Sequence, residues 1–199
     1  MTMTAAPLDR PATYADIEAA PEGQRAELIG GALFMQARLM PVHDKVQSGL
    51  MFLLGPAFQS GRGGPGGWWL VAEPELHLSR RHVLVPDLAA WRRERMPDFP
   101  REGRYPLAPD WACEIVSTST ASHDRLRKMP VYAEAGIRHL WLVDPVQRSI
   151  EVFELADGRY AMAGGEVGEG EARLTPFDAE ALAMGELWLP GASEDGSHG

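Results

Sequence analysis

The pattern of apolar and polar positions predicts helices alternating with short strands along most of the chain. Over residues 43–58, Val46, Leu50 and Leu54 recur at helical spacing, which predicts an amphipathic helix packed on the core. Residues 111–117 (WACEIVS) form a short apolar run between turn signals. Such a run is typical of a strand buried at the centre of a sheet.

Turn residues define the remaining elements. We expect Thr13 to cap a short helix through Ile17, and Gly30-Gly31 to close a hairpin within residues 26–35. Strands are predicted over 68–78 and 83–91, joined as a hairpin at 79–82, and over 139–143 and 149–155, with Asp157-Gly158 closing a further hairpin. A helix is predicted from about 124 to 135 and ends at Gly136. Pro130 predicts either a kink in it or a start that includes the proline.

The order of these elements favours one mixed α/β domain with helices on the faces of its sheet. The length of 199 residues, with 45% hydrophobic and 24% charged positions, suits a single globular domain. We expect this domain to span 13–190, between a flexible N-terminus (1–12) and a flexible tail (191–199). The stretch 61–67 (GRGGPGG) matches G-x-G-x-x-G but precedes a strand, so it is interpreted as a loop.

The distribution of charge and the single cysteine bear on the binding partners and the cellular location of the protein. The net charge of -9 belongs to residues 151–199, with 2 basic and 11 acidic groups, while residues 1–150 carry 17 of each. This balance predicts weak, salt-sensitive binding to nucleic acid rather than none. The single cysteine, Cys113, excludes an intrachain disulfide, and a cytoplasmic location is expected. No stretch approaches the roughly 20 apolar residues of a membrane span, so no membrane partner is expected.

Three charged residues stand where a purely structural role is costly. Asp87 follows Pro86 at the start of an apolar strand, Glu114 interrupts the predicted central strand, and Lys128 lies on the next helix. A carboxylate in a buried strand is unfavourable unless it is paired or binds a cation. Two converging carboxylates are typical ligands of Mg²⁺, and a nearby ammonium could orient water or stabilise phosphate charge.

At these residues the chain resembles a known superfamily. Pro86-Asp87 followed by Glu114 on the next strand resembles the signature of the PD-(D/E)XK nucleases. The surrounding blocks are similar to the Uma-two family of restriction endonucleases: HxxxxxxL at 43–50, VPDLAAW at 85–91, CEIVSTST at 113–120, DRLRKMPVYAEAGI at 124–137 and HLWLVDP at 139–145. The similarity covers roughly residues 13–160.

This resemblance implies a restriction-endonuclease-like α/β fold, a mixed sheet flanked by helices, with an N-terminal hairpin and C-terminal strands. It also implies hydrolysis of DNA phosphodiester bonds with Mg²⁺, or Mn²⁺, held by Asp87 and Glu114. Where the superfamily pattern has lysine, two residues past Glu114, this chain has Val116, and the family supplies the lysine from the following helix, here Lys128. Glu27 and His43 match family positions near the same edge.

Several alternatives remain open from the sequence. Asp87 could cap a turn, Lys128 could be a solvated residue paired with Asp124, and His43 could simply pack in its helix. The chain could be a catalytically silent module with a nuclease fold, or could hydrolyse a small phosphorylated substrate. Arginines at 80, 81, 92, 93, 95, 101 and 104 could contact phosphates, although a solvated hairpin explains them equally. A homodimer is expected because cleavage of two strands usually needs two sites.

Overall fold

The fold is built on one six-stranded mixed sheet. A computed structural model of the protein describes residues 4–37, 41–117 and 120–190. Within it, the main sheet has the order β12 (Arg159–Val167), β11 (Ser149–Ala156), β10 (His139–Asp144), β9 (Trp111–Ile115), β7 (Leu88–Arg92) and β4 (Trp68–Ala72). Strand β9 pairs in parallel with β10 and antiparallel with β7. The predicted central strand over 111–117 is thus confirmed.

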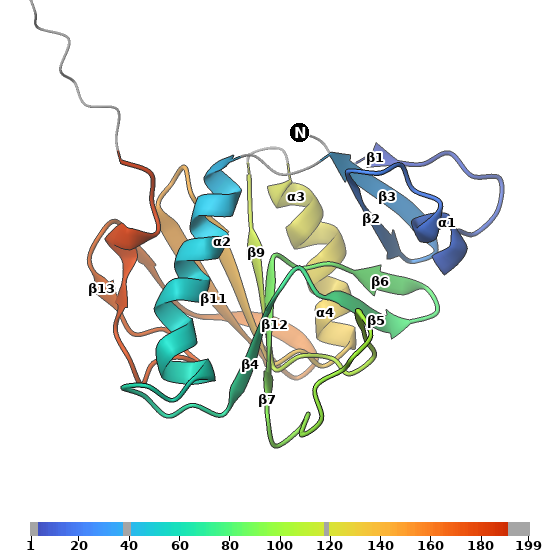
Figure 1. The fold of residues 1–199 in the computed structure, drawn as a ribbon. Coiled ribbons are helices and arrows are strands. Elements are labelled where there is room, and N and C mark those ends of the chain that lie inside the picture. Colours follow the sequence, from blue (N-terminus) through green and yellow to red (C-terminus); the bar gives the residue numbers. More distant parts are fainter. Residues whose placement is uncertain (1–3, 38–40, 118–119, 191–199) are drawn as a thin grey trace, which may run out of the picture.

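A second six-stranded sheet lies beside the first (Figure 1). Its order is β1 (Thr4–Ala5), β3 (Ala32–Ala37), β2 (Gln24–Ile29), β6 (His82–Leu84), β5 (Glu75–Ser79) and β8 (Arg104–Tyr105). Strands β2 and β3 form the predicted hairpin, and Gly30 and Gly31 adopt the positive φ angles of 63° and 82° that its tight turn requires. A small pair of strands, β13 (Glu171–Ala172) and β14 (Leu182–Ala183), follows near the C-terminus.

Helices cover both faces of the main sheet. Helix α2 (Pro41–Leu54) and helix α4 (Met129–Glu134) lie on either side of β9 in Figure 1. Val46 and Leu50 of α2 share a core cluster with Cys113, whereas α4 packs in a second cluster with Ala112. Because side chains alternate along a strand, Cys113 and its neighbour Glu114 face opposite sides. Cys113 is a buried core residue, as expected.

The shorter helical elements complete the description. Helix α1 (Tyr14–Glu18) begins after Thr13, as predicted, and α3 (Ala121–His123) precedes α4. The described residues also form the π-helical turns η1 (Gly55–Gln59) and η2 (Asp124–Lys128) and the 3₁₀ turn η3 (Met184–Glu186). The described residues hold no helix that is long and apolar enough to span a membrane.

The prediction of two long strands over 68–78 and 83–91 is wrong. The chain forms four strands there, with β4 and β7 paired in the main sheet and β5 and β6 paired in the second sheet. Pro74 and Pro86 lie at the two breaks, where a residue without an N–H cannot continue a ladder. Asp87 therefore lies where the chain passes from the second sheet to the main one.

The helix predicted from 124 to 135 is longer and contains a π-turn. It begins at Ala121 in α3, continues through η2 and ends at Glu134, before Gly136 with a φ of 75°. Met129 N donates to Asp124 O, five residues earlier, and Pro130 falls in the first turn of α4. The wider turn thus immediately precedes the proline, whose ring would crowd an ordinary α-helical turn.

Two smaller expectations complete the comparison. Residues 92–110, for which no strand is predicted, hold the short strand β8, which pairs with β5. Within the predicted N-terminal segment, Thr4 and Ala5 pair with β3. The predicted tail, 191–199, lies outside the described residues, and the domain bounds remain a prediction.

Candidate functional site

The structure brings Lys128 together with two of the predicted acids. Lys128 Nζ lies 3.1 and 3.2 Å from the two carboxylate oxygens of Glu114 and 3.0 Å from Oε1 of Glu27. Oδ1 of Asp124 lies 3.8 Å from the same nitrogen. Each of these four residues is at most 5% exposed, so Lys128 is not the solvated helix residue of the alternative interpretation.

Asp87 is tied directly to the strand that carries Glu114. Its Oδ2 accepts a hydrogen bond of 2.6 Å from Ile115 N, and its Oδ1 accepts one of 3.0 Å from the Arg25 guanidinium. Gln47 of α2 donates to the Asp87 carbonyl oxygen at 2.8 Å. Asp87 is only 2% exposed, and its carboxylate accepts a hydrogen bond from β9 instead of capping a turn.

Glu27 connects the second sheet to the site. Its Oε1 accepts from Val85 N at 2.8 Å as well as contacting Lys128. Its Oε2 is buried and has no hydrogen-bond partner within the described part of the chain. A buried carboxylate oxygen without a donor is costly, and such a group favours a cation or a water molecule nearby.

A small cavity joins these groups. It has a volume of about 10 Å³, close to the space that one water molecule requires. The lining residues are Arg25, Gln36, His43, Asp87, Glu114, Ile115, Thr120, Asp124 and Lys128. His43 is buried on α2 and borders the cavity, so four of the five predicted residues, Asp87, Glu114, Lys128 and His43, line it, while Glu27 reaches it through Lys128.

Sequence reasoning did not assign to the site three residues that contact the predicted ones, although it named Asp124 as a partner of Lys128. Tyr132 donates a hydrogen bond of 2.5 Å to Glu114 Oε1, Asp124 lines the cavity, and Arg25 bridges Asp87 and Glu73. The signals were present in the spacing. Positions 124, 128 and 132 follow one another at four-residue steps along a helix, and Arg25 lies two residues before Glu27 on the same face of a strand.

Burial and the crowding of like charges raise the pKa values of two acids in the site. Burial raises the pKa of Glu114 well above its usual value, an effect that Lys128 opposes and Asp124 reinforces. Burial also raises the pKa of Asp124, to about 6. Burial alone would lower the pKa of Lys128, but Glu114, Glu27 and Asp124 together raise it, so the ammonium stays charged.

The charge balance of the site fits a divalent cation. Four buried carboxylates, those of Glu27, Asp87, Glu114 and Asp124, face two cations, Lys128 and Arg25. With all four ionised, the formal excess is two negative charges, which one Mg²⁺ would neutralise, whereas burial without a cation favours the protonated forms of Glu114 and Asp124. Among the described residues, no three His, Cys, Asp or Glu side chains already form a complete metal cluster. A Mg²⁺ ion held by one or two carboxylates, with water as the other ligands, does not require one.

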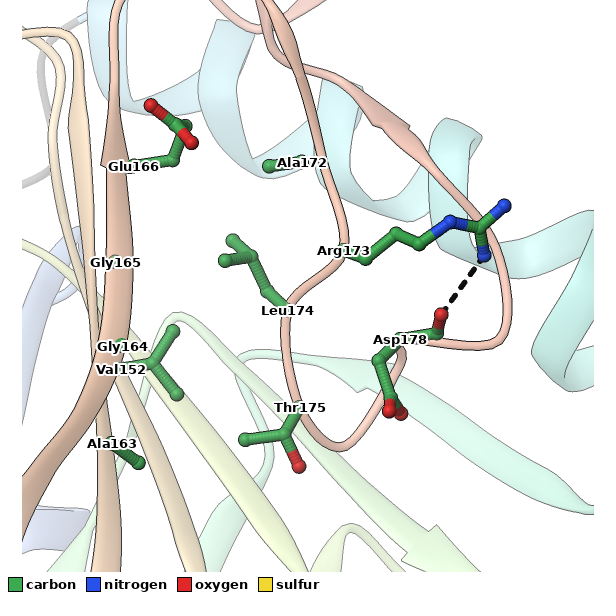
Figure 2. A pocket seen from close by; sticks show the side chains of 10 residues that line it. All are labelled: Val152, Ala163, Gly164, Gly165, Glu166, Ala172, Arg173, Leu174, Thr175 and Asp178. Carbon is green, nitrogen blue, oxygen red and sulfur yellow. Dashed lines mark hydrogen bonds between the residues drawn. The ribbon is translucent and has the colours of Figure 1, made fainter.

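Two wider pockets lie away from these residues. One, of about 290 Å³, lies between β12 and the segment 172–178, and its Arg173 guanidinium donates to the backbone oxygen of Asp178 at 2.9 Å (Figure 2). The other, of about 410 Å³, is lined by Trp68, Arg92, Glu94, Arg95, Asp110, Arg138 and His139. None of the predicted site residues lines either pocket. The larger cavities therefore lie away from the buried carboxylates, and cavity volume does not identify the candidate site.

The architecture is that of a restriction-endonuclease-like fold. A solved structure described as "a putative nuclease belonging to DUF820" from Anabaena variabilis ATCC 29413 is similar to this chain, with a TM-score of 0.69 and 19% sequence identity. The similarity covers 89% of this chain and 97% of the other. With a sequence identity of only 19%, this similarity supports the fold and not a shared activity.

The sequence itself places the chain in a family. The model of the Uma2 family, described as "Putative restriction endonuclease", matches residues 11–183, and the protein belongs to this family. The resemblance inferred from the sequence blocks is thereby confirmed. A comparison with curated proteins finds no match.

Proposed function

We propose that the protein is a Mg²⁺-dependent endonuclease that hydrolyses phosphodiester bonds of DNA. The observation that carries this proposal is the convergence of Asp87, Glu114 and Lys128 on one cavity with an excess of buried negative charge. The family description supports the reaction class. Asp87 and Glu114 are the proposed metal ligands, and Mn²⁺ is the expected substitute for Mg²⁺.

The bound cation would supply a Lewis acid for the phosphodiester oxygen and an acidified water molecule. The residues of the chain have separate parts in this scheme. Lys128 carries the positive charge that the superfamily pattern assigns to position 116, where this chain has Val116, and it holds Glu114 through both carboxylate oxygens. Arg25 binds one oxygen of Asp87 while Ile115 N of β9 donates to the other, and Glu27 contacts Lys128.

The electrostatics of the remaining surface bear on the choice of substrate. Arg92 and Arg93 stack over Trp68 and Trp69, each 3.9 Å from the ring centre, while Arg80 is exposed at the β5–β6 turn. Contacts to DNA phosphates from such residues would be few, and the acidic segment 151–199 opposes them. Binding to DNA should therefore be weak and should fall steeply with salt.

Cleavage of supercoiled plasmid by the purified full chain tests the proposal. Wild type should nick the plasmid with Mg²⁺ or Mn²⁺ and not with EDTA, and Asp87→Asn and Glu114→Gln should abolish nicking. Glu134→Gln, an exposed acid on α4, is the matched control and should leave cleavage unchanged. Equal cleavage by wild type and Glu114→Gln would reject the proposed site.

Two further outcomes separate the alternatives. Absence of Mg²⁺ binding at millimolar concentration, together with absence of cleavage, would favour the catalytically silent module. Hydrolysis of nucleotides without cleavage of DNA would favour a small phosphorylated substrate. We also propose a cytoplasmic homodimer, and light scattering of the eluting protein, which gives the mass against the 21.8 kDa of one chain, tests the dimer.

A further inference from the structure

Tyr132 combines an apolar environment with one polar contact. It is a fully buried residue of α4, in the core cluster that also holds Val116, Val131 and Leu140. A phenylalanine would fill the same apolar space. The hydroxyl group adds one hydrogen bond, 2.5 Å long, and its acceptor is Oε1 of Glu114.

Because of this bond, the two oxygens of the Glu114 carboxylate accept different numbers of hydrogen bonds. Oε1 accepts from Tyr132 at 2.5 Å and from Lys128 at 3.1 Å, whereas Oε2 accepts from Lys128 alone within the described residues, at 3.2 Å. A carboxylate oxygen with two strong donors is a poorer ligand than one with a single donor, because its lone pairs are occupied. The geometry thus leaves Oε2 as the freer oxygen of Glu114.

The hydroxyl group donates its one hydrogen to Oε1 of Glu114 and so restrains the carboxylate through a single bond. Buried hydroxyl groups are unfavourable unless they are bonded in this way.

We propose that Tyr132 is a positioning residue that locks the Glu114 carboxylate so that Oε2 faces a divalent cation. This proposal rests on the proposed function, because it takes Glu114 as a metal ligand. Residues that hold metal ligands by a hydrogen bond usually contribute about 10- to 100-fold to metal affinity or activity. We expect Tyr132 to contribute within that range.

The test compares Tyr132→Phe with Tyr160→Phe. Tyr160 is the matched control because its hydroxyl donates to a backbone oxygen, that of Ile137, at 2.6 Å. Titration calorimetry with MgCl₂ on the full chain, without DNA, measures metal affinity directly. Tyr132→Phe should bind Mg²⁺ about 10- to 100-fold more weakly than wild type, and Tyr160→Phe should bind it as wild type does. In plasmid cleavage at saturating Mg²⁺, Tyr132→Phe should lower kcat and leave the KM for DNA unchanged.

A double-mutant cycle adds a criterion that a general loss of stability would not meet. In a Glu114→Gln background, Tyr132→Phe should cause no further loss of Mg²⁺ affinity, because the group it orients is gone. Equal Mg²⁺ affinity of wild type and Tyr132→Phe overturns the positioning role while leaving the proposed function intact. Failure of wild type to bind any divalent cation overturns both.

If Tyr132→Phe does not fold, the wild type itself provides the test. A hydroxyl proton in a 2.5 Å bond to a carboxylate should give a downfield proton resonance. Adding MgCl₂ should shift that resonance if Glu114 binds the cation. A resonance that stays in place throughout a saturating titration overturns the proposal.

Discussion

Lys128 Nζ lies within 3.2 Å of both carboxylate oxygens of Glu114, although one residue belongs to a π-helical turn and the other to the centre of a sheet. Each group is buried, and each would be strongly unfavourable alone. Their pairing explains why a buried ammonium and a buried carboxylate are both tolerated in the core of this small protein.

The first prediction concerns the loss of this ammonium. Lys128→Met leaves the carboxylates of Glu114, Glu27 and Asp124 without their shared cation, and we expect the free energy of unfolding to fall by about 3–5 kcal/mol at neutral pH. Urea denaturation measures the change. Lys45→Met is the control, since Lys45 is the one other lysine in the chain and is only partly buried, with its ammonium donating to the Glu186 carbonyl oxygen. A similar small effect of both variants would contradict the central position of Lys128.

The second prediction concerns pH. The Asp124 carboxyl has a pKa of about 6 in the folded protein, against 3.8 ordinarily, so the folded state binds this proton more tightly than the unfolded state. Ionisation therefore lowers the free energy of unfolding as the pH rises from about 4 to 6, by up to about 3 kcal/mol. Asp124→Asn should remove this loss and be more stable than wild type above pH 6 in metal-free buffer. Urea midpoints from pH 4 to pH 8 measure it, and parallel curves for the two proteins would contradict it.

The third prediction concerns metal binding and stability. A cation that binds only the folded state stabilises it by about 2.7 kcal/mol at one hundred times its Kd. Wild type should gain thermal stability with MgCl₂, and gain more at pH 8 than at pH 5, because protons compete for the carboxylates. Asp87→Asn should lose this gain. A rise in Tm that is the same in wild type and Asp87→Asn would indicate a site elsewhere.

The fourth prediction concerns Arg25. One guanidinium nitrogen of Arg25 contacts Asp87 and the Val85 carbonyl oxygen, and the other contacts Glu73, a spread that the single nitrogen of an ammonium does not reproduce. Arg25→Lys should keep the charge, lower the free energy of unfolding by about 1–3 kcal/mol, and weaken Mg²⁺ binding by releasing Asp87. The control is Arg10→Lys, whose guanidinium pairs with Asp16 at the surface and should have almost no effect. Equal effects of the two substitutions would show that the bridge does not matter.

Much of the fold was predictable because local signals agreed with the final structure. The Gly30-Gly31 turn, the apolar run around Glu114 and the helical spacing of Val46 and Leu50 each define an element without help from distant residues. The division of residues 68–92 between two sheets was not predictable in this way. The apolar pattern continues across Pro74 and Pro86, and only tertiary pairing decides which sheet each piece joins.

The candidate site shows the same limit. An acid inside an apolar strand drew attention to Glu114, and a rare lysine drew attention to Lys128. Arg25, Asp124 and Tyr132 have ordinary surroundings in the sequence, since charged and aromatic residues are common in exposed strands and helices. Spacing places Asp124 and Tyr132 on the same helix face as Lys128, and Arg25 on the same strand face as Glu27. The partners of Arg25 and Tyr132, which are Asp87 and Glu114, lie 62 and 18 positions away, and spacing alone does not reveal those contacts.

The crossing of the chain at Pro86-Asp87 has a mechanical consequence. Arg25 and Glu27 belong to the second sheet, while Glu114 belongs to the main sheet, and Asp87 lies at the junction. A small sliding of one sheet against the other would therefore change the contact of Glu27 with Lys128 and that of Arg25 with Asp87 together. We therefore expect the affinity of the proposed cation site to depend on how firmly the two sheets stay docked.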